Sequence, residues 1–188
     1  MILERFPTFC PHDFVFKIAK SPADLAGFFS VRREIFCEEQ AIFTGDDRDI
    51  FDEKMIPIVC KTLIAGMEDS VAGVVRINEW KPGHWQGSRL GVSMDFRRIR
   101  HFSPGVAVRN LQPCYHGLGA LGAGLIYKAV STATALGCQE FLATVQHQNA
   151  RFFQRLHWEP LEELMLHGIL HVRMRADLAY YHAAARVA

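Results

Sequence analysis

The segment YHGLGALGAGLIYKAV (residues 115–130) contains four glycines, Gly117, Gly119, Gly122 and Gly124, and the first three spell G-x-G-x-x-G. A glycine-rich turn that opens a helix presents unpaired backbone N–H groups and the positive end of the helix dipole. Such a turn can bind a pyrophosphate or another anion, because small residues let the ligand approach the backbone closely. The alternative is that these glycines serve only close packing of a helix on a sheet.

The same letters are the fingerprint of dinucleotide-binding folds, but their context argues against NAD. That fingerprint follows the first strand of its domain, and an acidic residue at the end of the next strand holds the ribose. Here the glycines follow about four expected strands, and the next strand ends in Val145 and Gln146. The acid that would hold the ribose is absent, so the segment predicts an anion site of another kind.

Elements that could position this turn follow from hydropathy patterns, caps and turn residues. Ser21 and Pro22 are typical of a helix start, and Gly137 ends the helix that the glycines open. Asn149 is expected to cap a later helix. The expected order is a strand (14–20), a helix (21–40), three strands (55–63, 70–80 and 88–96), the glycine-opened helix, a strand (138–146), a helix (149–158) and a last strand (168–178). This alternation predicts an α/β or α+β sheet with helices on its faces.

Taken together, the strand SRLGVSMDF, the small-residue turn, the following helix and strand, and NARFFQRLHW resemble the core of the GNAT N-acetyltransferase superfamily. VRREIFCEEQ resembles the substrate-side helix of that family. The likeness runs from about Val15 to Leu178 and is strongest to a bacterial subgroup associated with nitrogen starvation. It implies one acyltransferase domain over residues 1–188, with a mixed, mainly antiparallel sheet that is splayed at its central strands.

By this resemblance, acetyl-CoA or another acyl-CoA is the co-substrate, and a small-molecule amine receives the acyl group by direct attack. The central strand would pair with the pantetheine arm, and the turn would hold the pyrophosphate. Gly119 stands where relatives carry Arg or Gln. Phe153 replaces the usual acidic Tyr, so water or another tyrosine would protonate the thiolate. The residues that the resemblance assigns to the coenzyme are Leu90, Gly91, Val92, Gly117, Gly119, Ala120, Leu121, Gly122, Ala123, Gly124, Asn149 and Phe153.

For the acceptor amine, three residues are candidates for the general base, which needs a group that titrates near working pH. They are Glu39, Glu79 and His147, and each has the alternative interpretation of a solvated surface residue. The substrate-side helix assigns Arg33, Phe36 and Glu38 to substrate binding.

Three other interpretations remain open. Acyl-homoserine-lactone synthases share this fold, and the chain offers Arg33, Phe36, DDRDIFD (46–52) and WQGSRLGV (85–92), although Gln86 replaces their Glu. A chain that binds acyl-CoA without catalysis is a second alternative. A metal site from Cys10/His12 and Cys114/His116 is a third, but C-x-H is not a zinc spacing, and no metal is expected.

Composition excludes several classes of protein. The 188 residues carry a formal charge of +1, which lacks the basic excess of most nucleic-acid binders. Five scattered cysteines imply no disulfide framework, and the start resembles no signal peptide, so we expect a cytoplasmic protein. No apolar run approaches the ~20 residues that span a membrane. A homodimer stays open.

Overall fold

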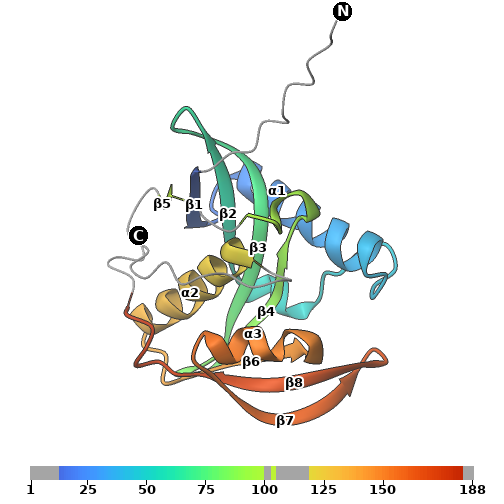
Figure 1. Cartoon of the computed structure of the whole chain (residues 1–188), viewed down its shortest axis with the longest axis vertical. Coiled ribbons are helices and arrows are strands. Elements are labelled where there is room, and N and C mark those ends of the chain that lie inside the picture. The colour runs from blue at the N-terminus through green and yellow to red at the C-terminus, as the bar shows by residue number, and fades with distance from the viewer. Residues whose placement is uncertain (1–12, 100–102, 105–118, 184–188) are drawn as a thin grey trace, which may run out of the picture.

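The computed structural model describes residues 13–99, 103–104 and 119–183, which form one mixed sheet with helices on both faces (Figure 1). The strand order is β5-β1-β2-β3-β4-β6-β8-β7. The strands are β1 (Asp13–Ile18), β2 (Ile56–Ile64), β3 (Met67–Lys81), β4 (His84–Val92), β5 (Ser103–Pro104), β6 (Glu140–Gln146), β7 (Trp158–Leu166) and β8 (Ile169–Ala176). Within this sheet β1–β5 and β4–β6 are parallel pairs, and the other neighbours are antiparallel.

Two helices cover opposite faces of the sheet. Helix α1 (Pro22–Arg33) continues into the π-helical turn η1 (Glu34–Glu39) and packs Phe28, Val31 and Ile35 on one face. Helix α2 (Gly119–Ala135) buries an apolar stripe that includes Leu121 and Leu125 against the other face. The short helix α3 (Ala150–Arg155) adds Phe152 and Phe153 to this second core.

The central strands β4 and β6 pair over only part of their length. Their parallel register runs from His84 opposite Glu140 to Gly87 opposite Ala143 and ends there. Beyond this point Ser88–Val92 and Thr144–Gln146 do not pair with one another, so the sheet opens between them. The splayed central strands that the resemblance implied are therefore present.

Several expected elements are confirmed at their ends as well as in type. The Ser21 hydroxyl accepts the Asp24 N–H at 3.1 Å, and Pro22 is the first residue of α1. The helical segment ends at Gln40, where the Gln40 N–H bonds the Ile35 carbonyl in the π-helical pattern.

Three expectations were wrong. Residues 84–87, which were expected to lie in the connection before a strand at 88–96, begin β4, because they pair with both β3 and β6. Met94–Phe96 form a 3₁₀ turn instead of continuing that strand. The helix expected over 149–158 ends at Arg155, and Trp158 starts β7, a strand that was missed because Pro160 and three glutamates hide its pattern.

Candidate active site

A cavity of about 900 Å³ lies where β4 and β6 part. Leu90, Gly91 and Val92 form its wall on β4, while Asn149 and Phe153 line it from the opposite side. Beneath the gap its walls are apolar side chains from the sheet and from helix α2. They are Val75, Ile126, Ala129, Val130, Phe141, Ala143, Val145 and Trp158. The cavity thus lies against the expected pantetheine strand and extends between the sheet's central strands.

Strand β4 carries a bulge at this wall. Arg76 pairs with Ser88 and Val74 pairs with Gly91, so Arg89 and Leu90 together oppose the single residue Val75. Arg89 has φ +53°, a left-handed conformation that is costly for a side-chain-bearing residue. A bulge of this kind bends the strand and redirects its backbone groups, and such bulges are frequent beside active sites.

A network of buried ion pairs holds Arg89 in this conformation. Its Nε lies 2.9 Å from the Asp47 carboxylate, and its Nη2 donates to the Asp47 carbonyl at 2.8 Å. Asp47 also accepts from Nε of Arg32 at 2.9 Å. Asp49 accepts two bonds from Arg76, at 2.6 and 3.0 Å. The segment 47–52 is thereby fixed over the face of β3 and β4.

Asp52 completes this network. Arg32 donates from Nη1 to one Asp52 oxygen at 2.5 Å and from Nη2 to the other at 3.1 Å. Burial alone would raise the pKa of the Asp52 carboxyl, but the bonds from Arg32, Arg76 and the Asp49 N–H outweigh it and lower that pKa well below its usual range. The Arg32 side chain is 0% exposed, so its charge depends wholly on these partners.

Arg33, the arginine assigned to the substrate from sequence, lies elsewhere. Its side chain is 65% exposed and is paired at 3.4 Å with Glu38, which is also exposed, and neither residue lines the cavity. Phe36 is buried and does line it. The arginine that α1 directs inward is the preceding residue, Arg32.

The three sequence candidates for the base are placed differently. Glu39 lines the cavity, but Arg97 holds both its oxygens at 2.6 Å, and these bonds lower the pKa of its carboxyl. Glu79 accepts the Gly83 N–H in the β3–β4 turn, outside the cavity lining. His147 is 56% exposed, lies 3.6 Å from Glu163 and is also outside that lining.

The start of α2 shows two reasons for glycine. Gly119 has φ +64°, and a Cβ there would stand 2.7 Å from the Arg97 carbonyl oxygen. A Cβ on Gly124 would meet the Phe16 ring at 2.4 Å, so this glycine permits close packing of α2 on β1. Residues 119–124 do not line the cavity, and Gly117 lies outside the described residues.

Asn149 occupies the N-cap position of α3, as expected, but its side chain makes no capping bond. Asn149 also lines the cavity. Phe153 is buried edge-on against Trp158, with ring centroids 5.1 Å apart. Its ring offers the cavity an apolar surface and no proton.

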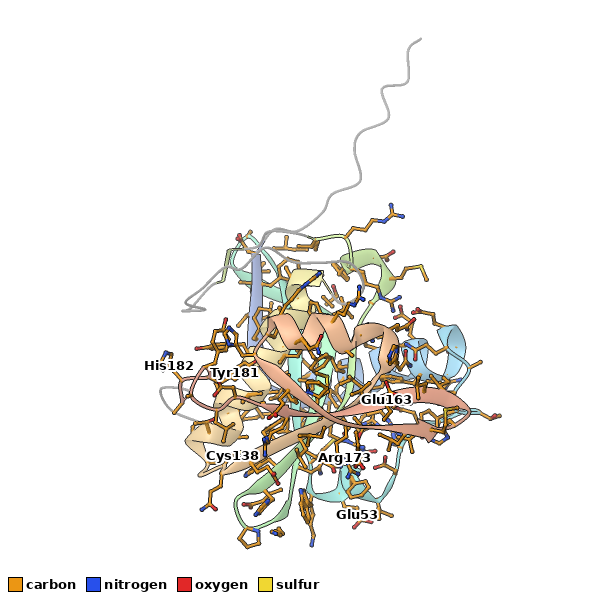
Figure 2. The ribbon with its side chains drawn as sticks, turned by 60° about the horizontal axis from the view of Figure 1, so that its bottom comes forward. Glu53, Cys138, Glu163, Arg173, Tyr181 and His182 are labelled. Atoms are coloured by element: carbon orange, nitrogen blue, oxygen red, sulfur yellow. The ribbon has the colours of Figure 1, made fainter. Side chains whose placement is uncertain are left out.

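The β7–β8 hairpin bridges across the cavity to the chain after η1. The tip residue His167 packs edge-on against Phe43 at 5.2 Å, and Arg89 lies over the same Phe43 ring at 4.4 Å. Gln146 of β6 donates to Gln40 at 3.0 Å. Arg173 of β8, labelled in Figure 2, also lines the cavity and is paired with Glu162 of β7 at 2.6 Å.

Two further features concern metals and membranes. Within residues 13–99, 103–104 and 119–183 no group of three His, Cys, Asp or Glu side chains could hold a metal ion. Cys10, His12, Cys114 and His116 lie outside those residues. None of the described helices is long and apolar enough to cross a membrane.

Known structures resemble this fold closely although their sequences differ. A candidate N-acetyltransferase from Lactobacillus plantarum superposes with a TM-score of 0.69 at 16% identity, covering 88% of this chain and 99% of its own. An acyl-CoA N-acyltransferase from Pseudomonas aeruginosa gives 0.62 at 18% identity, covering 87% and 98%. The described chain has the GNAT fold.

Acyl-homoserine-lactone synthases are also among the structural neighbours. The CoA-dependent synthase BjaI, solved with S-adenosylmethionine and isopentyl-CoA, gives a TM-score of 0.61 at 16% identity, covering 88% of this chain and 83% of its own. No protein-family model and no curated protein matches the sequence. The nitrogen-starvation subgroup therefore stays a prediction.

Sequence reasoning missed part of this site. Arg76 was not singled out, although an arginine within the apolar run of β3 is a sign of a buried ion pair. Gln40, Phe43, His167 and His171 were also missed, because nothing in their local sequence shows that the hairpin tip meets the end of η1.

Proposed function

We propose that this protein is an acyltransferase that moves an acyl group from coenzyme A to an amine of a small molecule by direct attack in a ternary complex. The parting of β4 and β6 over a cavity carries this proposal. Where two strands separate, their backbone N–H and C=O groups can pair with an extended amide-containing ligand. The pantetheine arm of coenzyme A has that shape and chemistry.

The donor is assigned to the β4 side of the cavity. Leu90, Gly91 and Val92 would bond the arm, and Asn149 would offer its amide while Phe153 packs against the thioester end. The pyrophosphate would bind at the start of α2, at the backbone N–H groups of Leu121 and Gly122, since the Ala120 N–H donates to the Ile99 carbonyl at 3.4 Å.

The acyl transfer requires the amine to be aligned with the thioester carbonyl, and it requires no covalent enzyme intermediate. Holding the amine against the thioester carbonyl can supply about 7–11 kcal/mol of the barrier lowering. A backbone N–H aimed at the developing oxyanion adds about 3–4 kcal/mol. The β4 bulge at Arg89 and Leu90 would turn such an N–H toward the cavity. The leaving thiolate would take its proton from water, since Phe153 has none to give.

The test is amine-dependent release of the coenzyme A thiol. Acetyl-CoA and octanoyl-CoA are each incubated with a panel of amino acids, polyamines and homoserine lactone, and products are weighed by mass spectrometry. The proposal expects thiol release that depends on one class of amine, with a matching gain of acyl mass. Absence of transfer to any amine from a protein that binds coenzyme A would favour a sensor instead.

A second candidate is acyl transfer like that of acyl-homoserine-lactone synthases. The observation favouring it is that Arg32, the acidic segment 47–52 and Arg89 form one buried network beside the cavity. Those are the segments in which the sequence resembles these synthases, apart from Arg32 replacing Arg33. Production of an acyl-homoserine lactone from S-adenosylmethionine would establish this candidate, while its absence beside transfer to other amines would exclude it.

A further inference from the structure

The acceptor reaction needs a proton acceptor, and the cavity wall on β8 carries an imidazole with one ring nitrogen already hydrogen-bonded. His171 is half-buried and lines the cavity that Leu90 and Gly91 line from β4. Its Nδ1 lies 2.8 Å from the Ile169 carbonyl oxygen. A carbonyl oxygen only accepts hydrogen bonds, so Nδ1 must carry the proton. In the neutral ring Nε2 then holds the lone pair.

That lone pair is not occupied by the surrounding side chains. Gln146 stands opposite His171 in the β6–β8 register, but its amide is used on both sides, by Gln40 at 3.0 Å and by Gln148 at 2.8 Å. Leu164, the β7 neighbour of His171, is apolar. Among the residues that the structure describes, none forms a hydrogen bond with Nε2 of His171.

We propose that His171 is the general base of the acyl transfer, which rests on the function proposed above. Nε2 takes one proton from the ammonium group of the acceptor. The freed amine attacks the thioester carbon, the C–N bond forms, and the C–S bond breaks. The second amine proton goes to the departing thiolate through water, and His171 returns the first proton to solvent. Amide, coenzyme A thiol and one proton are the balanced products.

The charged groups that line this wall are already in ion pairs, and the other imidazole of the wall, His167, is exposed at the hairpin tip. Arg173, next on the same face of β8, is held by Glu162 of β7, and Glu39 at the end of η1 is held by Arg97. His167 at the hairpin tip packs on Phe43. A neutral imidazole accepts a proton at its bare ring nitrogen, which suits a general base.

The substitution His171→Asn distinguishes the role of Nδ1 from the role of Nε2. The Asn amide N–H can still donate to the Ile169 carbonyl, as Nδ1 does, but it has no group in place of the Nε2 lone pair. His182→Asn is the matched control, because His182 is exposed and does not line the cavity. Thermal unfolding of both variants verifies that the fold is intact.

The kinetic arm uses acetyl-CoA and the amine of the panel that is acylated fastest, with hydroxylamine as a second nucleophile because it is already neutral at pH 7. We expect kcat/KM of His171→Asn with the protonated amine to fall about 100-fold, and the acid limb of its pH profile to disappear. Transfer to hydroxylamine should fall far less, and His182→Asn should behave as wild type. An unchanged pH profile in His171→Asn would overturn the inference.

A second measurement, by NMR, is independent of activity. In ¹⁵N-histidine-labelled protein, the signal lost in His171→Asn identifies the ring, and its nitrogen shifts report the tautomer. We expect Nδ1 protonated and Nε2 bare at pH 8; the reverse tautomer would overturn the inference even if the protein is an acyltransferase. Failure of every amine in the panel would instead overturn the proposed function.

Discussion

At the scale of single residues, the site depends on which of two adjacent arginines faces inward. The Arg32 side chain is 0% exposed and bonds Asp47 and Asp52, whereas the Arg33 side chain is 65% exposed. The sequence pattern alone does not distinguish them, because both fall near the inner stripe of a helix that becomes π-helical at Glu34. Only the packing of α1 on the sheet decides.

This difference predicts unequal costs for two neighbouring substitutions. Arg32→Ala leaves two buried carboxylates without their main partner, so the free energy of unfolding should fall by about 3–5 kcal/mol. Arg33→Ala removes an exposed pair with Glu38 and should cost less than about 1 kcal/mol. Urea unfolding of both variants gives the comparison. Equal losses would show that Arg32 is not the anchor of segment 47–52.

At the scale of elements, ion pairs hold segment 47–52 against β3 and β4, and we call this segment the clamp. These ion pairs are sensitive to acid. Burial opposes ionisation of Asp49 and Asp52, yet Arg76 and Arg32 outweigh it and lower the pKa of both carboxyls below the usual 3.8. A carboxyl with a lowered folded pKa stabilises the protein above its unfolded pKa. That stabilisation is lost as the pH falls through the folded value.

We therefore expect the free energy of unfolding to decrease as the pH falls below about 4, with these two groups adding no slope between pH 6 and 8. Asp52→Asn should be less stable at pH 7 and should lose less stability between pH 5 and 3. Glu53→Gln is the control, because Glu53 is exposed (Figure 2), and its pH profile should match wild type. An acid profile of Asp52→Asn identical to wild type would contradict this role of the clamp.

The elements that local sequence determines were predictable, and those that depend on distant pairing were not. Ser21 and Pro22 predict the start of α1, because helix capping is local and needs no tertiary contact. By contrast, His84–Gly87 form a strand only because β3 and β6 flank them. β7 is an edge strand rich in exposed glutamates, and its pairing with β8 is its main support.

The residues of the candidate site divide in the same way, into those that local sequence places and those that depend on distant pairing. Leu90, Gly91, Val92, Asn149 and Phe153, which the resemblance assigns to the coenzyme, all line one cavity, because a strand and a helix start carry their own sequence signals. Glu79 and His147 lie outside that cavity. Sequence reasoning did not find His171, because its proposed role depends on two features of the folded chain. One is the bond to a carbonyl two residues away, and the other is the hairpin that brings β8 beside the cavity.

At the scale of the whole molecule, the central claim is that an acyl-CoA donor lies between the parted strands. The measurement that tests it most directly is amide hydrogen exchange with and without acetyl-CoA, with NAD as the control ligand. We predict slower exchange with acetyl-CoA at 88–92 and 144–149 and at the start of α2, and no change with NAD. Protection confined to other segments, or equal protection by NAD, would contradict the account.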